Sequence, residues 1–192
     1  MMKKTIGLSM VLILSTAVSV NAAVVFSCLG NGSALDFEAS SGSHTLGGVQ
    51  VTLEANEGDV NASLEGLGIN RVGGGDESAA IDTKLGVEIL TVSFDVDVVF
   101  DSLTISDLGV DDALDASFNG GAAIQLTSSG LHHLGVTLLA GEVLTLTATE
   151  PHAPNPNNGV RIKEFVVTAV PEPSSLALLS IACIAALLRR RP

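Results

Sequence analysis

Residues 48–55 read Gly48-Val-Gln-Val-Thr-Leu-Glu-Ala55, and their pattern predicts the kind of element from which the domain is built. Apolar residues at positions 49, 51 and 53 alternate with polar residues at positions 50, 52 and 54. Because successive side chains of an extended strand point to opposite sides, this period of two residues predicts a strand with one buried and one solvated face. Strands of this kind are typical of antiparallel sheets.

The same period recurs along the chain, in runs bounded by glycine-rich turns and rich in valine and threonine. The other expected strands cover residues 86–95, 103–106, 144–147 and 161–170, and in the last run the apolar side changes along the way. Residues 23–169 carry no sustained helical stripe with caps. We therefore predict an all-β fold for residues 23–169, an antiparallel β-sandwich that is jelly-roll-like.

The N-terminal segment has the three parts of an export signal. Met1-Met2-Lys3-Lys4 is basic, residues 6–20 are apolar, and Val20-Asn21-Ala22 suits signal peptidase. We expect residues 1–22 to be a signal peptide, with cleavage after Ala22. The mature chain then starts at Ala23, outside the cytoplasm.

The C-terminal segment reads as a membrane stop. Val170-Pro-Glu-Pro-Ser-Ser175 is followed by an apolar run, residues 176–188, and by Arg189-Arg190-Arg191. The two prolines keep the backbone extended, so that a helix starts only after them, with Ser174 as its N-cap. The run has no polar face, which is typical of a helix in lipid.

The length of this helix makes it a short membrane span. From Ser174 to Leu188 it covers about 22 Å, less than the bilayer core of about 30 Å. The arginines lengthen the span by snorkelling and hold the C-terminus in the cytoplasm. A buried core helix is the alternative, which the closing arginines disfavour. We therefore expect a single transmembrane helix that anchors the chain in the inner membrane, facing the periplasm.

Residues 170–192 together resemble the PEP-CTERM sorting signal of exported proteins from Gram-negative bacteria that produce exopolysaccharide. The resemblance implies recognition by an exosortase, a membrane-embedded cysteine transpeptidase, and processing near the Pro-Glu-Pro box. It implies release or transfer to the cell surface or extracellular matrix. A sortase substrate and a lipid-anchored protein are disfavoured, because there is no Leu-Pro-x-Thr-Gly box and no cysteine directly after the cleavage site. The sorting motif is then Val170, Pro171, Glu172, Pro173 and Ser174, and the membrane stop is Arg189, Arg190 and Arg191.

The composition of residues 23–169 excludes several classes of function. This segment contains 20 acidic and four basic residues, which gives a net charge of about −16. A surface with this charge repels nucleic acid and anionic lipid. Cys28 is the only cysteine of this segment, so no intramolecular disulfide forms within it. Tryptophan and tyrosine are absent from the chain, which removes the rings that commonly stack on sugars.

Two acidic segments are candidates for calcium binding. Residues 107–115 carry four carboxylates between two expected strands, and Asp76, Glu77 and Asp82 follow three glycines. Calcium takes six to eight oxygen ligands, and glycine-flanked acidic loops supply them, although neither segment has the spacing of an EF-hand. The alternative is a solvated acidic turn that blunts a sheet edge. The preferred calcium ligands are Asp107, Asp111, Asp112 and Asp115.

Other motifs predict little chemistry. His132 and His133 are adjacent on an expected strand and so face opposite sides, which disfavours a shared metal. A proline-rich loop at residues 150–159 is expected to be stiff and exposed to solvent. No Gly-x-Ser-x-Gly or phosphate-loop motif occurs, and no carboxylate pair is singled out for hydrolysis.

Three functions remain open from the sequence. The first is a non-enzymatic exported protein, sorted to the cell surface or to the exopolysaccharide matrix. The second is a calcium-assisted carbohydrate-binding or adhesive module. The third is a surface hydrolase, which would require two carboxylates that face each other across a pocket.

Overall fold

The computed structural model describes residues 22–30, 33–71, 80–83, 86–108, 112–149 and 159–171. Within these ranges the chain forms strands and no helix, and every strand pair is antiparallel, which confirms the predicted all-β fold. The strands are β1 (Ala23–Ser27), β2 (Ser41–Leu46), β3 (Val49–Ala55), β4 (Asp59–Ala62), β5 (Leu67–Asn70), β6 (Ile89–Phe94), β7 (Val98–Leu108), β8 (Ala113–Phe118), β9 (Ile124–Leu126), β10 (Gly130–Leu138), β11 (Val143–Thr149) and β12 (Val160–Ala169).

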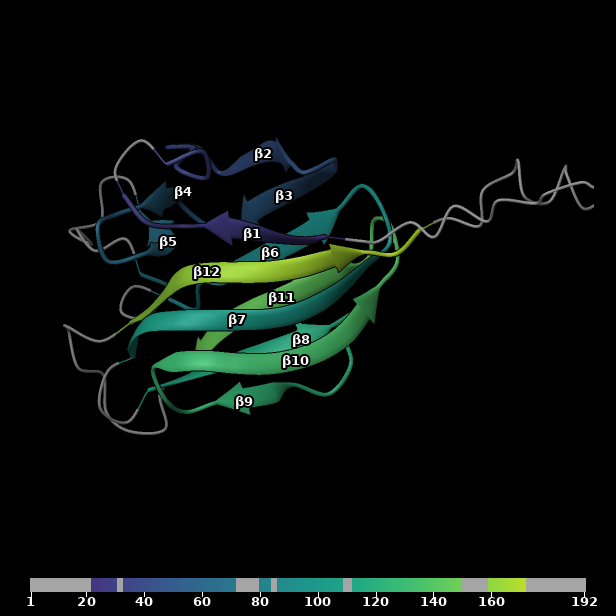
Figure 1. Ribbon diagram of the computed structural model, residues 1–192. Helices are drawn as coiled ribbons and strands as arrows, with labels where there is room; N and C mark the ends of the chain where they lie inside the picture. The colour runs from purple at the N-terminus through teal and green to yellow at the C-terminus, as the bar shows by residue number, and fades with distance from the viewer. Residues whose placement is uncertain are drawn as a thin grey trace, which may run out of the picture.

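The strands form two sheets. The front sheet has the order β10-β7-β12-β5-β4, with β1 also paired to β12, and the back sheet has the order β2-β3-β6-β11-β8-β9. In Figure 1 the strands β10, β7, β12 and β1 lie in front of β11, β8 and β6. β5 and β1 share one edge of β12, since β5 pairs at Ile162 and β1 pairs at residues 164–168.

Phenylalanine rings join the inner faces of the two sheets. The ring of Phe165 on β12 lies 5.0 Å from that of Phe26 and 5.9 Å from that of Phe100, both in the front sheet. Phe94 of the back sheet approaches the same ring at 6.3 Å. Because rings from both sheets meet in one buried cluster, the sheets pack face to face around a shared core.

β12 changes its buried face through irregular pairing. Val160 and Ile162 are buried at its start, and Phe165 and Val167 are buried further on. The register with β7 shifts between Ile162 and Glu164, as in a β-bulge, which moves the apolar set from even to odd positions. This shift explains why the apolar side changes along residues 161–170.

The two ends of the described domain leave it side by side. Ala23 on β1 lies opposite Thr168 on β12, and Val98 on β7 lies opposite Ala169. We call this end of the molecule, where Ala22 and Pro171 lie, the tail pole. The other end, where Leu108 pairs with Val160, is the far pole. The eleven residues of β7 separate the two poles by about 35 Å.

The predicted membrane segments lie outside this description. Within the described ranges, no helix has the length and hydropathy needed to cross a membrane. Residues 1–21 of the expected signal peptide and the apolar run of residues 176–188 are not among the described residues.

Candidate functional site

The described part of the sorting motif begins where β12 ends. β12 finishes at Ala169, and the Val170 N–H donates a 2.8 Å hydrogen bond to the Asp97 carbonyl. Pro171 is exposed and has no N–H, so the ladder cannot continue through it. The motif therefore follows a core strand with no intervening linker. Glu172, Pro173, Ser174 and the three terminal arginines lie outside the described residues.

The turns around this exit are held by carboxylates. Asp97 Oδ1 accepts a 2.8 Å hydrogen bond from the Ala140 N–H, and Glu142 Oε2 accepts one of 2.8 Å from the Leu139 N–H. Asp95 Oδ1 accepts a 2.7 Å bond from the Gln50 N–H. Asp97 and Glu142 thus cap the turn between β10 and β11, where Leu139 is 53% exposed, and Asp95 caps the start of β3.

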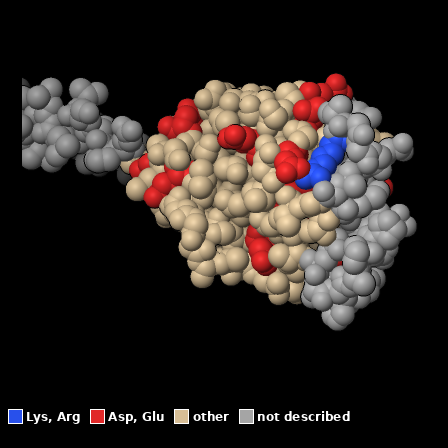
Figure 2. All heavy atoms as spheres, turned by 180° about the vertical axis from the view of Figure 1, so that it is seen from behind, with Lys and Arg blue, Asp and Glu red and all other residues tan. Residues whose placement is uncertain are grey.

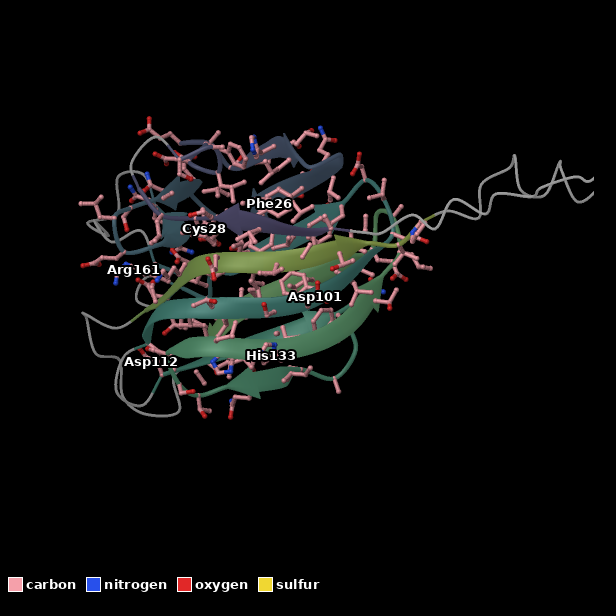
Figure 3. The ribbon with its side chains drawn as sticks, viewed as in Figure 1. Phe26, Cys28, Asp101, Asp112, His133 and Arg161 are labelled. Carbon is pink, nitrogen blue, oxygen red and sulfur yellow. The ribbon has the colours of Figure 1, made fainter. Side chains whose placement is uncertain are left out.

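The first predicted calcium segment lies at the far pole. Asp107 is part of β7 and lies opposite Arg161, and Asp115 is part of β8, where it accepts a 3.3 Å bond from Gln125 Nε2. Asp112 is buried at 7% exposure, whereas Asp111 is outside the described residues. Figure 3 shows Asp112 and Arg161 at the same end of the molecule. Asp112 is therefore not part of a solvated turn.

The second acidic segment reaches the same pole. Ile81 forms a two-way backbone bridge with Val160, at 2.9 Å in both directions, and Val160 pairs with Leu108 on its other side. Asp82 is therefore about 10 Å, or two strand spacings, from the end of β7. Asp76 and Glu77 lie outside the described residues.

Asp82 belongs to a buried ionic cluster. Its N–H donates a 3.0 Å hydrogen bond to Glu88 Oε2, and Asp82 and Glu88 are 2% and 1% exposed. Arg71 Nε lies 3.9 Å from Glu88 Oε1, and Arg71 also pairs with Glu57. Among the residues that the structure describes, no three His, Cys, Asp or Glu side chains gather in a way that could hold a metal ion. Calcium binding by residues 107–115 remains a prediction.

The other candidate side chains stay apart. His132 is half-buried and His133 is exposed on β10, and His132 Nε2 hydrogen-bonds the Ser128 carbonyl at 2.8 Å. The two rings therefore face opposite sides, as predicted. Cys28 is fully buried, and burial raises the pKa of its thiol far above the usual range, with Glu164 adding to the shift.

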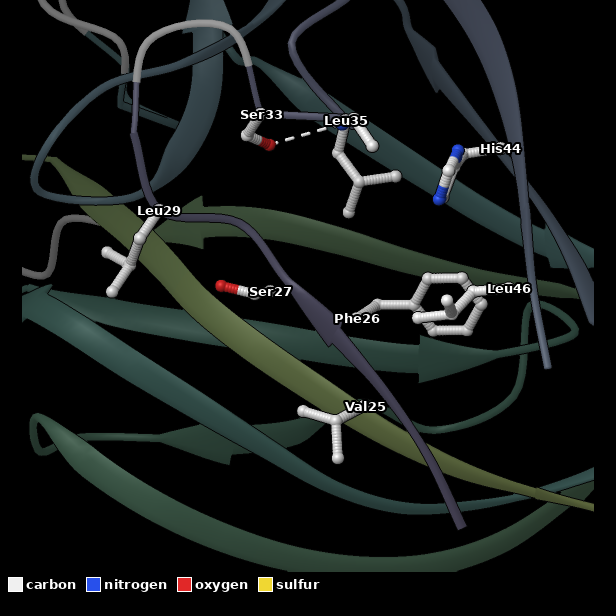
Figure 4. Close-up of a pocket in the computed structure, with 9 residues that line it drawn as sticks. Val25, Phe26, Ser27, Leu29, Ser33, Leu35, His44 and Leu46 are labelled. Atoms are coloured by element: carbon white, nitrogen blue, oxygen red, sulfur yellow. Dashed lines mark hydrogen bonds between the residues drawn. The ribbon is translucent and has the colours of Figure 1, made fainter. Parts of the chain in front are cut away.

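The structure also has a groove that the sequence did not predict. It runs along β1, between the edge of the front sheet and β2 at the edge of the back sheet, and has two adjoining hollows of about 290 and 520 Å³. Figure 4 shows the residues that line the smaller one. The smaller hollow is lined by Val25–Ser27, Leu29, Ser33–Leu35, His44 and Leu46. The larger is lined by Ala22–Val25, Leu46, Gly47 and Ala169 at the tail pole. We refer to the larger one as the tail-pole hollow.

A comparison with protein families identifies the C-terminal segment. Residues 169–191 match the family model of the PEP-CTERM protein-sorting motif. No curated protein and no solved structure was found to match the chain. The chain thus carries a PEP-CTERM motif, which implies export, processing by an exosortase-like enzyme and sorting to the cell surface.

Proposed function

We propose that this chain is a non-enzymatic surface or matrix protein, anchored in the inner membrane by its C-terminal helix until an exosortase-like enzyme processes it. The match of residues 169–191 to the sorting motif carries the proposal. The position of the motif supports it, because Pro171 is exposed directly after β12. After processing, the β domain becomes associated with exopolysaccharide at the cell surface.

The proposed domain is a jelly-roll-like sandwich displayed away from the membrane. From β5 to β12 the chain crosses from one sheet to the other at each connection, except between β8 and β9. This repeated crossing is the basis for proposing a jelly-roll-like topology. Since the tail leaves one pole, the far pole points away from the bilayer by about 35 Å, the length of β7. The far pole is then the end available to matrix components.

The two hollows differ in lining from the site that a surface hydrolase would need. They carry apolar side chains, serines and His44, rather than two carboxylates that face each other as glycoside hydrolysis requires. The surface view in Figure 2 shows acidic side chains dispersed over the back face.

A sorting assay in the native host tests the proposal. Pro171→Ala with Pro173→Ala should leave export intact but block processing, because the helix can then extend backwards over the backbone that the enzyme must reach. Deletion of residues 189–191 should instead weaken the membrane stop, so that unprocessed protein escapes into the periplasm. Mass spectrometry of the C-terminus reports both effects. Identical processing of the wild type and the double proline variant would contradict recognition of the box.

A second candidate is a calcium-assisted carbohydrate-binding or adhesive module. It is favoured by the position of Asp82 and of the end of β7, which carries Asp107, at the far pole on either side of Val160. Calorimetry with a panel of polysaccharides, with calcium and with a chelator, tests it. Polysaccharide binding that disappears with the chelator supports this module, and the absence of binding in both conditions leaves the first proposal alone.

A further inference from the structure

The tail-pole hollow is an apolar surface at the point where the chain leaves the domain. None of its lining residues, Ala22–Val25, Leu46, Gly47 and Ala169, has a charged or hydrogen-bonding side chain. Val25 and Leu46 remain 47% and 43% exposed. Leu46 stands at the tip of the β2–β3 hairpin, where Gly47 and Gly48 adopt φ of +59° and +81° in a two-residue turn.

The composition of this surface contrasts with the rest of the domain. Residues 23–169 carry a net charge of about −16, which keeps most of the surface away from anionic headgroups. At the same pole, Asp97 and Glu142 hydrogen-bond the β10–β11 turn beside Leu139, whereas Asp95 accepts a bond from the Gln50 N–H at the start of β3. No carboxylate lines the hollow itself, and Asp97 and Glu142 lie on the β10–β11 side of the pole, so the hollow offers an approach to lipid that keeps these two carboxylates away from it. Cleavage after Ala22 removes that residue from the lining and leaves the ammonium group of Ala23 as a cation at this site.

The sequence after the described domain places lipid within reach. The apolar run begins at Leu176, five residues after Pro171, and five extended residues span at most about 18 Å. The headgroup layer takes up about 5–8 Å of that distance on one side of the bilayer. A membrane-anchored chain therefore holds its tail pole close to the headgroups.

We propose that the tail-pole hollow docks on the lipid surface of the membrane, with Val25 and the Leu46 hairpin tip inserted at the interface. This inference rests on the proposed membrane anchor and adds a fixed orientation to it. The domain tilts toward the β1–β2 corner, so that Leu46 approaches the acyl chains while Leu139 and its neighbouring carboxylates stay in water. Exposed apolar side chains at a polar–apolar boundary gain from burial at the interface.

Depth-dependent fluorescence quenching tests the orientation. The chain contains no tryptophan, so Leu46→Trp, Leu139→Trp and Leu64→Trp each create a single reporter at an exposed leucine. Leu139 is the matched control at the same pole, and Leu64 lies in the turn between β4 and β5 and is 81% exposed. Each full chain is expressed with its export signal in a host that lacks the sorting enzyme, and is reconstituted in phosphatidylcholine vesicles with lipid brominated near the glycerol end.

The inference predicts quenching at Leu46→Trp that is about twofold or more stronger than at Leu139→Trp, and none at Leu64→Trp. Because tryptophan itself favours the interface, the two tail-pole variants share that bias and their difference reports orientation. Equal quenching at positions 46 and 139 in vesicles that float with the protein would contradict the docking surface while leaving the anchor intact. A chain that fails to float with vesicles would contradict the anchor, and this inference with it.

Discussion

The thiol of Cys28 is enclosed in the core beside the backbone of β1. Its Sγ lies 3.8 Å from the Phe26 carbonyl oxygen, and the side chain has no exposed surface. Because burial, with a further contribution from Glu164, raises the pKa of the thiol, the thiolate that reacts with disulfides is not populated at neutral pH. Cys28 therefore acts as a packing residue of the hydrophobic core.

We predict that Cys28 does not react with an aromatic disulfide reagent at pH 8 in the folded chain, and reacts at once in concentrated urea. The measurement uses Cys183→Ser, which removes the other cysteine of the chain. The reaction releases a coloured aromatic thiolate. If this product appears as fast with the folded protein as in urea, Cys28 is accessible in the fold and the prediction is wrong.

Glu142 has a pKa below its usual value. The backbone N–H of Leu139 is the larger cause, and a hydrogen bond from the side chain of Asn119 is the second. Because the pKa is lower in the folded state, the carboxylate stabilises the turn above the pKa of the unfolded chain. This stabilisation is lost as the pH falls through the lower, folded-state pKa.

Removal of the Asn119 amide should raise the pKa of Glu142 toward its usual value. Asn119→Gly is the suitable change, because Asn119 has a φ of +51° that glycine adopts without strain. An NMR titration of the Glu142 carboxyl carbon in the two proteins measures the shift. The same titration curve in both would assign the whole effect to the Leu139 N–H.

At the scale of elements, β12 organises the core. It pairs with β7 along one edge and with β1 and β5 along the other, and its Phe165 contacts three rings. Phe118 of β8 makes a single ring contact at the edge of this cluster, with Phe100 at 6.3 Å. Phe165 therefore anchors both sheets, whereas Phe118 lies at the periphery.

Phe165→Ala should lower the free energy of unfolding by about 3–5 kcal/mol, because it leaves a cavity between the two sheets. Phe118→Ala is the matched control and should cost less, since Phe118 is only half-buried. Urea denaturation of both variants measures the difference. Equal losses would mean that the core does not depend on the cluster around Phe165.

The elements that alternation predicts are the long, half-buried strands. β3, β6 and β11 follow the two-residue period in their burial, so the sequence identifies them. β5 has three consecutive buried residues, Leu67–Ile69, and no such period, because its surroundings are set by β4, β12 and the bridge of Ile69 to Ala80. Local sequence carries no signal for a strand of this kind.

The sorting motif and the tail-pole hollow also differ in how far the sequence predicts them. The sorting motif is linear, and its prolines, apolar run and arginines are recognisable in order along the sequence. The tail-pole hollow forms where Val24 of the front sheet meets Gly47 of the back sheet, and a Cβ on Gly47 would lie 2.9 Å from Val24 Cγ2. A surface formed by segments this far apart in the sequence depends on how the two sheets pack. The alternation of apolar and polar residues along one strand does not predict that packing.

At the scale of the whole molecule, charge sets the response to ions. Residues 23–169 combine 20 acidic side chains with four basic ones, so self-repulsion opposes the compact state and any salt that screens it should stabilise the domain. A calcium site would add a second contribution, because a ligand that binds only the folded state stabilises it by mass action. The two contributions differ in their dependence on particular carboxylates.

We predict that sodium chloride raises the melting temperature of residues 23–171, and that calcium at matched ionic strength raises it further by about 3–6 °C at ten times its dissociation constant. Asp111→Asn with Asp112→Asn should remove the calcium increment and leave the sodium chloride shift in place. Because Asp112 is buried, the double variant can have a lower melting temperature without salt, so the comparison uses the increment within each protein. Differential scanning calorimetry in both salts gives these increments. If the calcium increment is the same in the double variant, the far pole responds only to screening, and the calcium-assisted module is abandoned in favour of a displayed acidic domain.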